Sequence, residues 1–218
     1  MERSAGPAEP PRECPACPRL VAFRHRYRAA EPSWHNAPVH SFGAADARLL
    51  IVGLAPGLRG ANRTGRPFTG DYAGDLLYGT LLAYGFANGV YGADPADGLS
   101  LRDCRITNAV RCVPPENKPT PLEINTCRSF LAATIAGMPH LAAILALGRV
   151  AHESTLVALG RKRSSVRFGH AGQYEVAPHL ALFSSYHCSR YNTQTGKLTT
   201  EMFHQVFAAI RSYLDARA

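Results

Sequence analysis

The chain has 218 residues, 46% of them hydrophobic and 18% charged, a composition that excludes an intrinsically disordered protein. No apolar run approaches the ~20 residues of a membrane-spanning helix, and residues 1–13 lack the apolar core of a secretory signal. Lys and Arg number 24 against 16 Asp and Glu, and the resulting charge of +8 favours a polyanionic partner. We expect a cytoplasmic protein with no membrane association, and a monomer, because no segment indicates an obligate interface.

The first expected feature along the chain is a flexible tail over 1–13, followed by a single domain over 14–218. A short apolar run at 47–54, stopped by Pro and Gly, predicts a buried parallel strand, and three further strands are expected at 105–110, 141–147 and 181–186. Helices are expected over 18–30, 72–86, 122–136, 148–159 and 199–214. Strands that alternate with helices imply right-handed crossovers, so the expected fold class is α/β, a three-layer α/β/α sandwich around a four-stranded parallel sheet.

In a parallel sheet of this kind, ligands bind beyond the carboxyl ends of the strands. Functional side chains are therefore expected in the loops that follow Leu54, Val110 and Tyr186. The first of these loops is dense in glycine, and its segment 60–65 has the glycine spacing of a Walker A loop. Arg66 and Pro67 stand where that motif requires Lys and Ser or Thr, which excludes a triphosphate site of this type. A tight turn whose backbone N–H groups approach a ligand remains the expectation.

Several side chains in these loops are weak indicators when each is taken alone. Phe68 is compatible with a core residue and Asp71 with a solvated one. Asn108 is compatible with a turn former, and His187 with a structural histidine. Their common placement near the carboxyl ends of strands favours a functional interpretation.

Six cysteines in a chain without an export signal indicate reduced thiols, and therefore metal binding or burial rather than disulfides. Cys14 and Cys17 form a CxxC, and Cys112 and Cys127 follow with 14 residues between them. Four thiolates suit either zinc or a cubane iron–sulfur cluster. Zinc sites favour two short knuckles and this spacing provides one, which favours the cluster without deciding the question. The other two cysteines are expected to be simply buried.

Four motifs carry a family resemblance: Gly53-Leu-Ala-Pro-Gly57, Gly60-Ala-Asn-Arg-Thr-Gly-Arg-Pro-Phe-Thr-Gly-Asp71, Thr107-Asn-Ala-Val-Arg-Cys112 and His187-x-Ser-Arg-x-Asn192. Together they resemble the uracil-DNA glycosylase superfamily, and within it the iron–sulfur-containing family 5, the B-type enzymes. The resemblance spans residues 14 to about 204. The fold it implies, a small four-stranded parallel sheet between helices, agrees with the strands expected from the apolar runs.

The resemblance implies a structural [4Fe–4S] cluster held by Cys14, Cys17, Cys112 and Cys127. It also implies a pocket for an extruded base, and the residues expected along its wall are Gly53, Leu54, Ala55 and Gly57. We expect the cluster to fix the N-terminal helix and the proline-rich loop near the DNA-facing surface.

The chemistry that the resemblance implies is assigned to three side chains. Phe68 is expected to stack on the base. The Asn108 carboxamide is expected to donate to uracil O4 and to accept from N3–H. His187 is expected to donate to O2 as negative charge develops on the leaving base.

The sequence departs from better-known relatives at two places. Leu54 and Ala55 stand where those relatives carry Asp, Asn or Glu, so Asp71 is the expected group that orients water, with Asp75 as the alternative. In the last motif, Cys188 replaces a proline and Tyr191 replaces a leucine. We expect Tyr191 or Arg190 to fill the gap left by the extruded nucleotide. The expected phosphate contacts, whose alternative is a solvated charge, are Arg63, Arg66, Arg111 and Arg190.

The resemblance implies a monofunctional DNA repair glycosylase. Such an enzyme hydrolyses the N-glycosidic bond of uracil, and of other deaminated bases, in DNA. No lysine lies in a motif near the sugar, so a Schiff-base lyase step is not expected. Two alternatives stay open: an iron–sulfur protein that binds uracil or damaged DNA without efficient excision, and a zinc-stabilised nucleic-acid binder without a base pocket.

Overall fold

Five strands form the central sheet in the computed structural model, which describes residues 8–217. The order is β4-β1-β5-β7-β6, and the strands comprise, in that order, Cys104–Asn108, Leu49–Gly53, Ala143–Leu147, Leu180–Ser185 and Gly172–Ala177. The first four pair in parallel and correspond to the four expected strands. The expected α/β class is therefore confirmed.

The fifth strand corrects the expected strand count. β6 lies at the edge of the sheet and runs antiparallel to β7. Its residues, Gly-Gln-Tyr-Glu-Val-Ala, largely alternate between exposed and partly covered positions, because one face of this edge strand meets solvent. It therefore contains no apolar run of the kind that marks the buried parallel strands.

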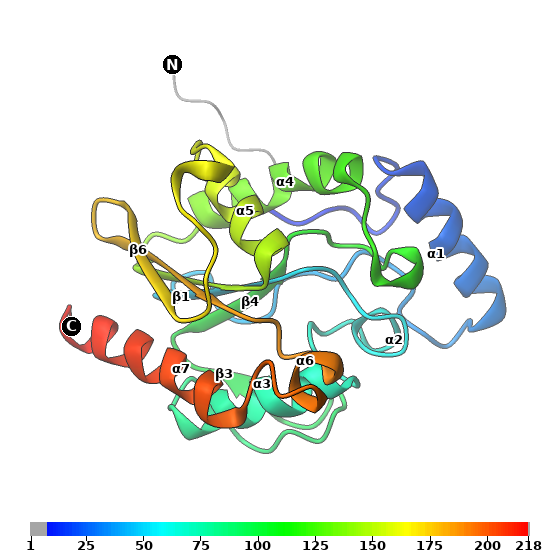
Figure 1. Cartoon of the computed structure of the whole chain (residues 1–218). Helices are drawn as coiled ribbons and strands as arrows, with labels where there is room; N and C mark the ends of the chain where they lie inside the picture. Colours follow the sequence, from blue (N-terminus) through cyan, green and yellow to red (C-terminus); the bar gives the residue numbers. More distant parts are fainter. Residues whose placement is uncertain (1–7, 218) are drawn as a thin grey trace.

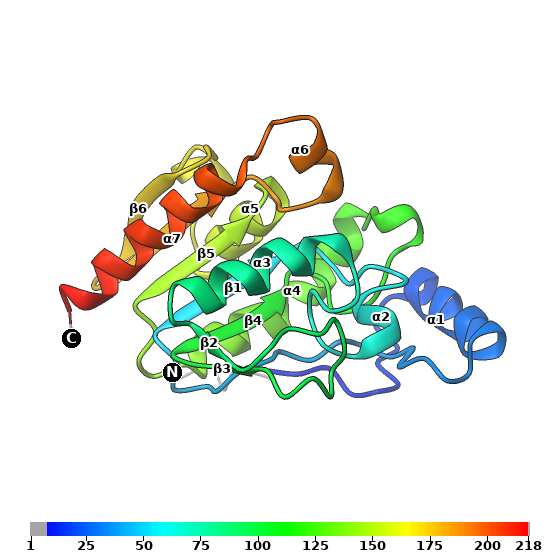
Figure 2. The ribbon, with the colours of Figure 1, turned by 90° about the horizontal axis from the view of Figure 1, so that it is seen from below.

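Helices cover both faces of the sheet (Figures 1 and 2). One face carries α3 (Tyr72–Ala83) and α7 (Thr200–Asp215), and the other carries α4 (Pro121–Ala136) and α5 (Arg149–Ala158). Side chains that alternate along β1 supply the two apolar cores. Leu49 and Ile51 join the core under α3 and α7, whereas Leu50 and Val52 join the core under α4 and α5.

The remaining elements are peripheral. α1 spans Pro18–Ala30, as expected from the sequence. The short elements are α2 (Ala61–Thr64), α6 (Arg190–Gln194), two 3-10 turns (Pro115–Asn117 and Arg163–Ser165) and a small hairpin of β2 (Ala87–Asn88) and β3 (Ser100–Leu101). Among residues 8–217, no helix combines the length and the apolar character needed to cross a membrane.

Residues 8–13 differ from the expected flexible tail, whose residues 1–7 lie outside the described part of the chain. The Glu9 carboxylate pairs with Arg111 at 2.9 Å and with Arg105 at 3.3 Å, and it accepts a hydrogen bond from Ser41 N. Arg111 is buried, and this burial lowers the pKa of its guanidinium. The N-terminal segment is held in place because a buried guanidinium needs a counter-charge.

We predict that Glu9→Ala lowers the free energy of unfolding by about 2 kcal/mol, because it leaves Arg111 buried without a carboxylate. Urea denaturation measures the change. Glu116→Ala is the matched control, since Glu116 is exposed and pairs with the exposed Lys118. A loss for Glu9→Ala no larger than for the control would show that the segment is not held by this pair.

Candidate functional site

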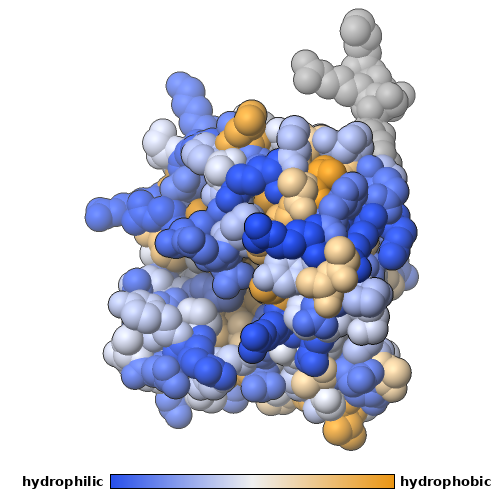
Figure 3. All heavy atoms as spheres, turned by 90° about the vertical axis from the view of Figure 1, so that its right-hand side faces the viewer, coloured by the Kyte–Doolittle hydropathy of each residue, from blue (hydrophilic) through white to orange (hydrophobic). Residues whose placement is uncertain are grey.

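One cavity of about 620 Å³ opens at the carboxyl ends of β1 and β4, the edge of the sheet where the sequence predicts function. Figure 3 views the side of the molecule that carries α1 and α2, where apolar atoms are visible in a hollow between hydrophilic side chains. The structure brings together most of the expected site residues, and those that line this cavity are Leu54, Ala55, Gly57, Phe68, Asp71, Asn108, His187 and Arg190.

Asn108 ends β4 and lies in register with Gly53, the last residue of β1. Its side chain is 2% exposed, and its Oδ1 atom is buried with no hydrogen-bond partner among the described residues. A side chain at Gly53 would collide with this oxygen and would lie 2.6 Å from Phe68 Cζ. Glycine is required there because the carboxamide and the ring meet over its backbone. The unpaired oxygen is suited to accept an N–H from a ligand.

Phe68 supplies an aromatic surface to the cavity. Its ring is 7% exposed and stacks with the His187 imidazole at a centroid distance of 5.9 Å and an angle of 28°. Its backbone has a φ of 53°, a left-handed conformation that bulky residues rarely adopt. Such strain is characteristic of functional loops that their surroundings hold in place.

His187 follows β7 and is half-buried against the cavity. Burial lowers the pKa of its imidazole to about 4, so the ring is neutral at physiological pH. Neither ring nitrogen has a hydrogen-bond partner within residues 8–217. The backbone of His187 is held by Asn192, whose Nδ2 donates a hydrogen bond to His187 O at 2.8 Å. A neutral imidazole can donate one hydrogen bond to a ligand in the cavity.

Asp71 caps the N-terminus of α3, where its Oδ1 accepts a hydrogen bond from Gly74 N at 3.2 Å. The other oxygen faces the glycine-rich loop, since a side chain at Gly57 would lie 3.0 Å from Oδ2. Burial raises the pKa of Asp71, and backbone hydrogen bonds partly offset that effect. Asp75 is exposed one turn later and lines a separate cavity, so Asp71 is the carboxylate at the cavity of Asn108.

Two arginines expected to contact phosphate are buried instead, which corrects those assignments. Arg66 is 5% exposed and binds both carboxylate oxygens of Asp97, at 2.7 and 2.8 Å. Arg111 is 1% exposed and pairs with Glu9. Neither guanidinium is available to a DNA backbone, because each is enclosed and already paired.

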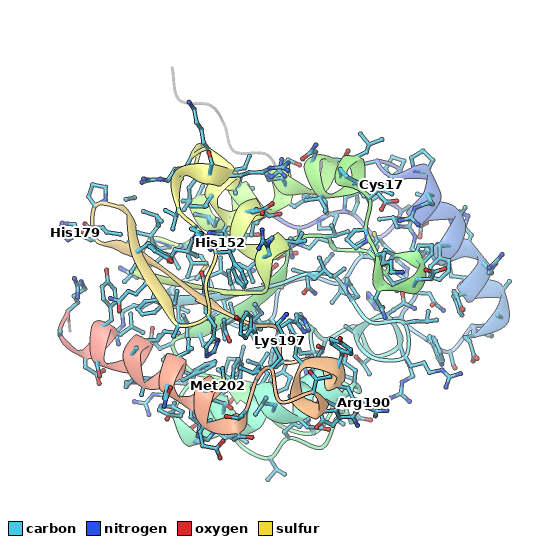
Figure 4. All side chains as sticks on the ribbon, viewed as in Figure 1. Cys17, His152, His179, Arg190, Lys197 and Met202 are labelled. Carbon is cyan, nitrogen blue, oxygen red and sulfur yellow. The ribbon has the colours of Figure 1, made fainter. Side chains whose placement is uncertain are left out.

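The other expected DNA-contacting residues lie at the surface. Arg63 is exposed on α2, and Tyr191 is 73% exposed in α6. Arg190 is exposed at the start of α6 (Figure 4), and its guanidinium lies 5.2 Å from the centre of the Tyr72 ring. These side chains can meet a nucleic acid without prior rearrangement of the core.

The structure adds cavity-lining residues that the sequence analysis missed, among them Arg59, Tyr72, Asn117 and Ser189. Asn117 lies in the proline-rich loop after β4 and has a φ of 56°. No sequence signal indicated that this loop folds back to the cavity. Arg59 lies between Gly57 and Gly60 in the glycine-rich loop after β1. This position in the loop was the sequence signal that could have identified it as a cavity residue.

Four cysteines line a second, small cavity between α1 and α4: Cys14, Cys17, Cys112 and Cys127. Figure 4 shows Cys17 at the end of α1 that faces α4. Two N–H groups point at these sulfurs: Arg24 Nη1 lies 3.7 Å from Cys112 Sγ, and Arg111 N donates to Cys127 Sγ at 3.3 Å.

Burial raises the pKa of Cys17 to about 11 and that of Cys112 to about 12, and neighbouring cysteines add to both shifts. A positive group among these sulfurs would reverse the effect, because it stabilises thiolates. No three described His, Cys, Asp or Glu side chains are grouped as in a single-ion metal site. The remaining cysteines, Cys104 and Cys188, are buried in the apolar core, as expected.

Comparison with known proteins identifies the family. The model of the uracil DNA glycosylase superfamily matches residues 40–211. A type-5 uracil-DNA glycosylase of Thermus thermophilus is 45% identical over 199 residues, which cover 88% of this chain and 90% of the relative. Relatives of the same description from Mycobacterium bovis and Pyrobaculum aerophilum are 43% and 38% identical, over 89% and 88% of this chain and 75% and 85% of theirs. The chain therefore belongs to the uracil-DNA glycosylase superfamily, in its type-5 group.

Proposed function

We propose that this chain is a DNA repair enzyme that hydrolyses the N-glycosidic bond of uracil in DNA and leaves an abasic site. The observation that carries the proposal is the buried, unpartnered Asn108 Oδ1 beside an aromatic ring in one cavity. The type-5 relatives, named for uracil-DNA glycosylase activity, support the same conclusion.

Base recognition follows from the chemistry of the pocket. A base must leave the helical stack to reach the cavity, and stacking on Phe68 would return ~1–3 kcal/mol of that cost. Uracil presents N3–H and O4, which match the oxygen and the amide nitrogen of Asn108. Cytosine presents the reverse pattern. Hypoxanthine also presents an N–H beside a carbonyl oxygen, which supports activity on other deaminated bases.

The departure of the base is assisted by His187. As the glycosidic bond breaks, its electron pair moves to the base, and negative charge grows on O2. A neutral imidazole that is already in place can donate a hydrogen bond to this oxygen, an effect worth roughly 3–4 kcal/mol in comparable sites. The depressed pKa of His187 keeps the ring in that neutral form.

Asp71 is the proposed water-orienting carboxylate. The sugar becomes oxocarbenium-like as the base leaves, and water then attacks its anomeric carbon. Asp71 accepts the proton from that water, so the base leaves as an anion and the sugar gains a hydroxyl. Among the described residues that line the cavity there is no lysine, in accord with hydrolysis rather than Schiff-base chemistry.

The first prediction from the proposed function concerns uracil excision itself. The wild-type protein should release uracil, but not thymine, from an otherwise identical labelled oligonucleotide, as read by alkaline cleavage of the abasic product. His187→Ala should lower kcat by roughly 10²–10³-fold with little change in DNA binding, because it removes a donor used mainly in the transition state. Binding without excision by the wild-type protein would instead support a damage-binding module.

A second prediction uses the pH dependence. Burial raises the pKa of Asp71, so the proton acceptor is lost at a higher pH than for an ordinary carboxyl. Activity should fall as pH decreases through that raised pKa, while His187 stays neutral down to about 4. Asp71→Asn should lower kcat by roughly 10²-fold or more and abolish this acid limb. The control Asp75→Asn should keep the wild-type kcat and the acid limb. A pH–rate profile unchanged by Asp71→Asn would refute the assignment of Asp71 as the proton acceptor.

We also propose that Cys14, Cys17, Cys112 and Cys127 hold a [4Fe–4S] cluster. Four sulfurs around one cavity, with N–H groups aimed at two of them, support thiolate ligation. When bound, the group would serve as a structural cross-link with no part in the hydrolysis. Its ligands would join the N-terminus of α1, the loop after β4 and the middle of α4.

Elemental analysis tests the cluster. We predict iron and inorganic sulfide in equal amounts in protein purified without oxygen, because a cubane contains them one to one. Cys112→Ala should lose both and should melt at a lower temperature. Cys104→Ala is the matched control. Cys104 is buried but is not one of the four proposed ligands, so this variant should keep its iron and its sulfide. Zinc without sulfide would contradict the cluster.

A further inference from the structure

The strained backbone of Phe68 lies outside every helix and strand, in the segment between α2 and α3. Its ring nevertheless has a defined place, against Gly53 and beside His187. A left-handed conformation at a bulky residue persists only where other groups hold it. The groups that hold it come from α3 and from the loop that follows β2.

Two tyrosine hydroxyls bind consecutive carbonyl groups of this segment. Tyr78 Oη donates to Pro67 O at 2.7 Å, and Tyr91 Oη donates to Phe68 O at 3.1 Å. The two tyrosine rings stack on each other with centroids 4.6 Å apart. Gly74 faces the same point, and a side chain there would collide with Phe68 O and with Tyr91 Oη. The space around this carbonyl is therefore filled on both sides.

The buried Arg66–Asp97 pair anchors the two tyrosines. The Arg66 guanidinium lies 5.4 Å from the centre of the Tyr78 ring and 5.9 Å from that of Tyr91. Its Nε donates to Thr69 Oγ1 at 2.7 Å, on the far side of Phe68. The pair thus connects the segment on either side of Phe68 to the loop that carries Asp97 and Tyr91.

We propose that Tyr78 and Tyr91, anchored by the Arg66–Asp97 pair, are positioning residues that set the Phe68 ring against the extruded base. The inference rests on the proposed function, since it requires a base in the cavity. Neither tyrosine lines the cavity, so both act through the Phe68 backbone. The role replaces the phosphate contact expected for Arg66.

The positioning role predicts a specific loss in base binding. Without one hydroxyl, a carbonyl of the strained segment loses its partner, and Phe68 can relax away from the position above Gly53. The stacked base and its hydrogen bond to Asn108 should then weaken together. Contacts to the DNA backbone, made by exposed side chains elsewhere, should stay the same.

The test compares two oligonucleotides that differ only in the nucleotide expected to enter the cavity. One carries 2′-fluoro-2′-deoxyuridine, which resists hydrolysis because the fluorine disfavours an oxocarbenium-like sugar, and the other carries a tetrahydrofuran abasic analogue. The ratio of their Kd values reports how strongly the base itself is held. Tyr78→Phe and Tyr91→Phe should each reduce the preference for the uridine oligonucleotide about fivefold, as expected for one lost hydrogen bond.

Tyr174→Phe is the matched control. Tyr174 Oη donates to the carbonyl of Arg167 at 2.8 Å, at an exposed position away from the cavity, so this variant also loses one tyrosine-to-carbonyl hydrogen bond and should keep the wild-type ratio. Melting temperatures identify the folded variants, and Tyr78→Phe and Tyr91→Phe provide two independent readings. Wild-type ratios in folded Tyr78→Phe and Tyr91→Phe would overturn the positioning role. Absence of any preference in the wild-type protein would instead overturn base recognition, and with it the proposed function.

Discussion

The Asn108 carboxamide oxygen is buried at the end of β4 without a partner among the described residues, and the rest of the site depends on it. An unpaired buried acceptor costs about 1–3 kcal/mol in the free protein. The parallel register sets Gly53 beside it, and the missing side chain of that glycine lets the Phe68 ring reach the same point. The fold thus keeps an unsatisfied group that a ligand N–H can satisfy.

Burial divides the charged groups into two sets with different roles. Arg66 and Arg111 are enclosed with their own carboxylates and hold chain segments together. Arg63 and Arg190 remain exposed and are available to phosphate. Beside Phe68, Asn108 and His187 supply neutral donors and acceptors, because burial lowers the pKa of His187 and keeps its imidazole uncharged. In the proposed function, the base and the DNA backbone would therefore be contacted by different kinds of groups.

The sequence was sufficient for the parallel strands, because their residues are buried, with Arg105 of β4 as the one partly exposed exception, and most of them are apolar. The sequence was also sufficient for the cavity residues that follow the carboxyl ends of the strands, since a parallel topology brings those ends to one edge of the sheet. Burial of Arg66 and Arg111 could not be predicted, because their partners Asp97 and Glu9 are distant in sequence and lie in irregular segments. The same is true of Asn117, whose loop reaches the cavity through tertiary packing alone.

The most direct test of Asn108 as the acceptor uses a substrate in which a methyl group replaces the N3–H of uracil. Single-turnover excision by the wild-type protein would be measured on oligonucleotides that carry uracil or 3-methyluracil at the same position. The methyl group removes the N3–H that Asn108 Oδ1 is expected to accept. Uracil should be released rapidly and 3-methyluracil at least tenfold more slowly, on the order of the 1–3 kcal/mol for an unpaired buried acceptor. Equal rates for the two bases would contradict this role of Asn108.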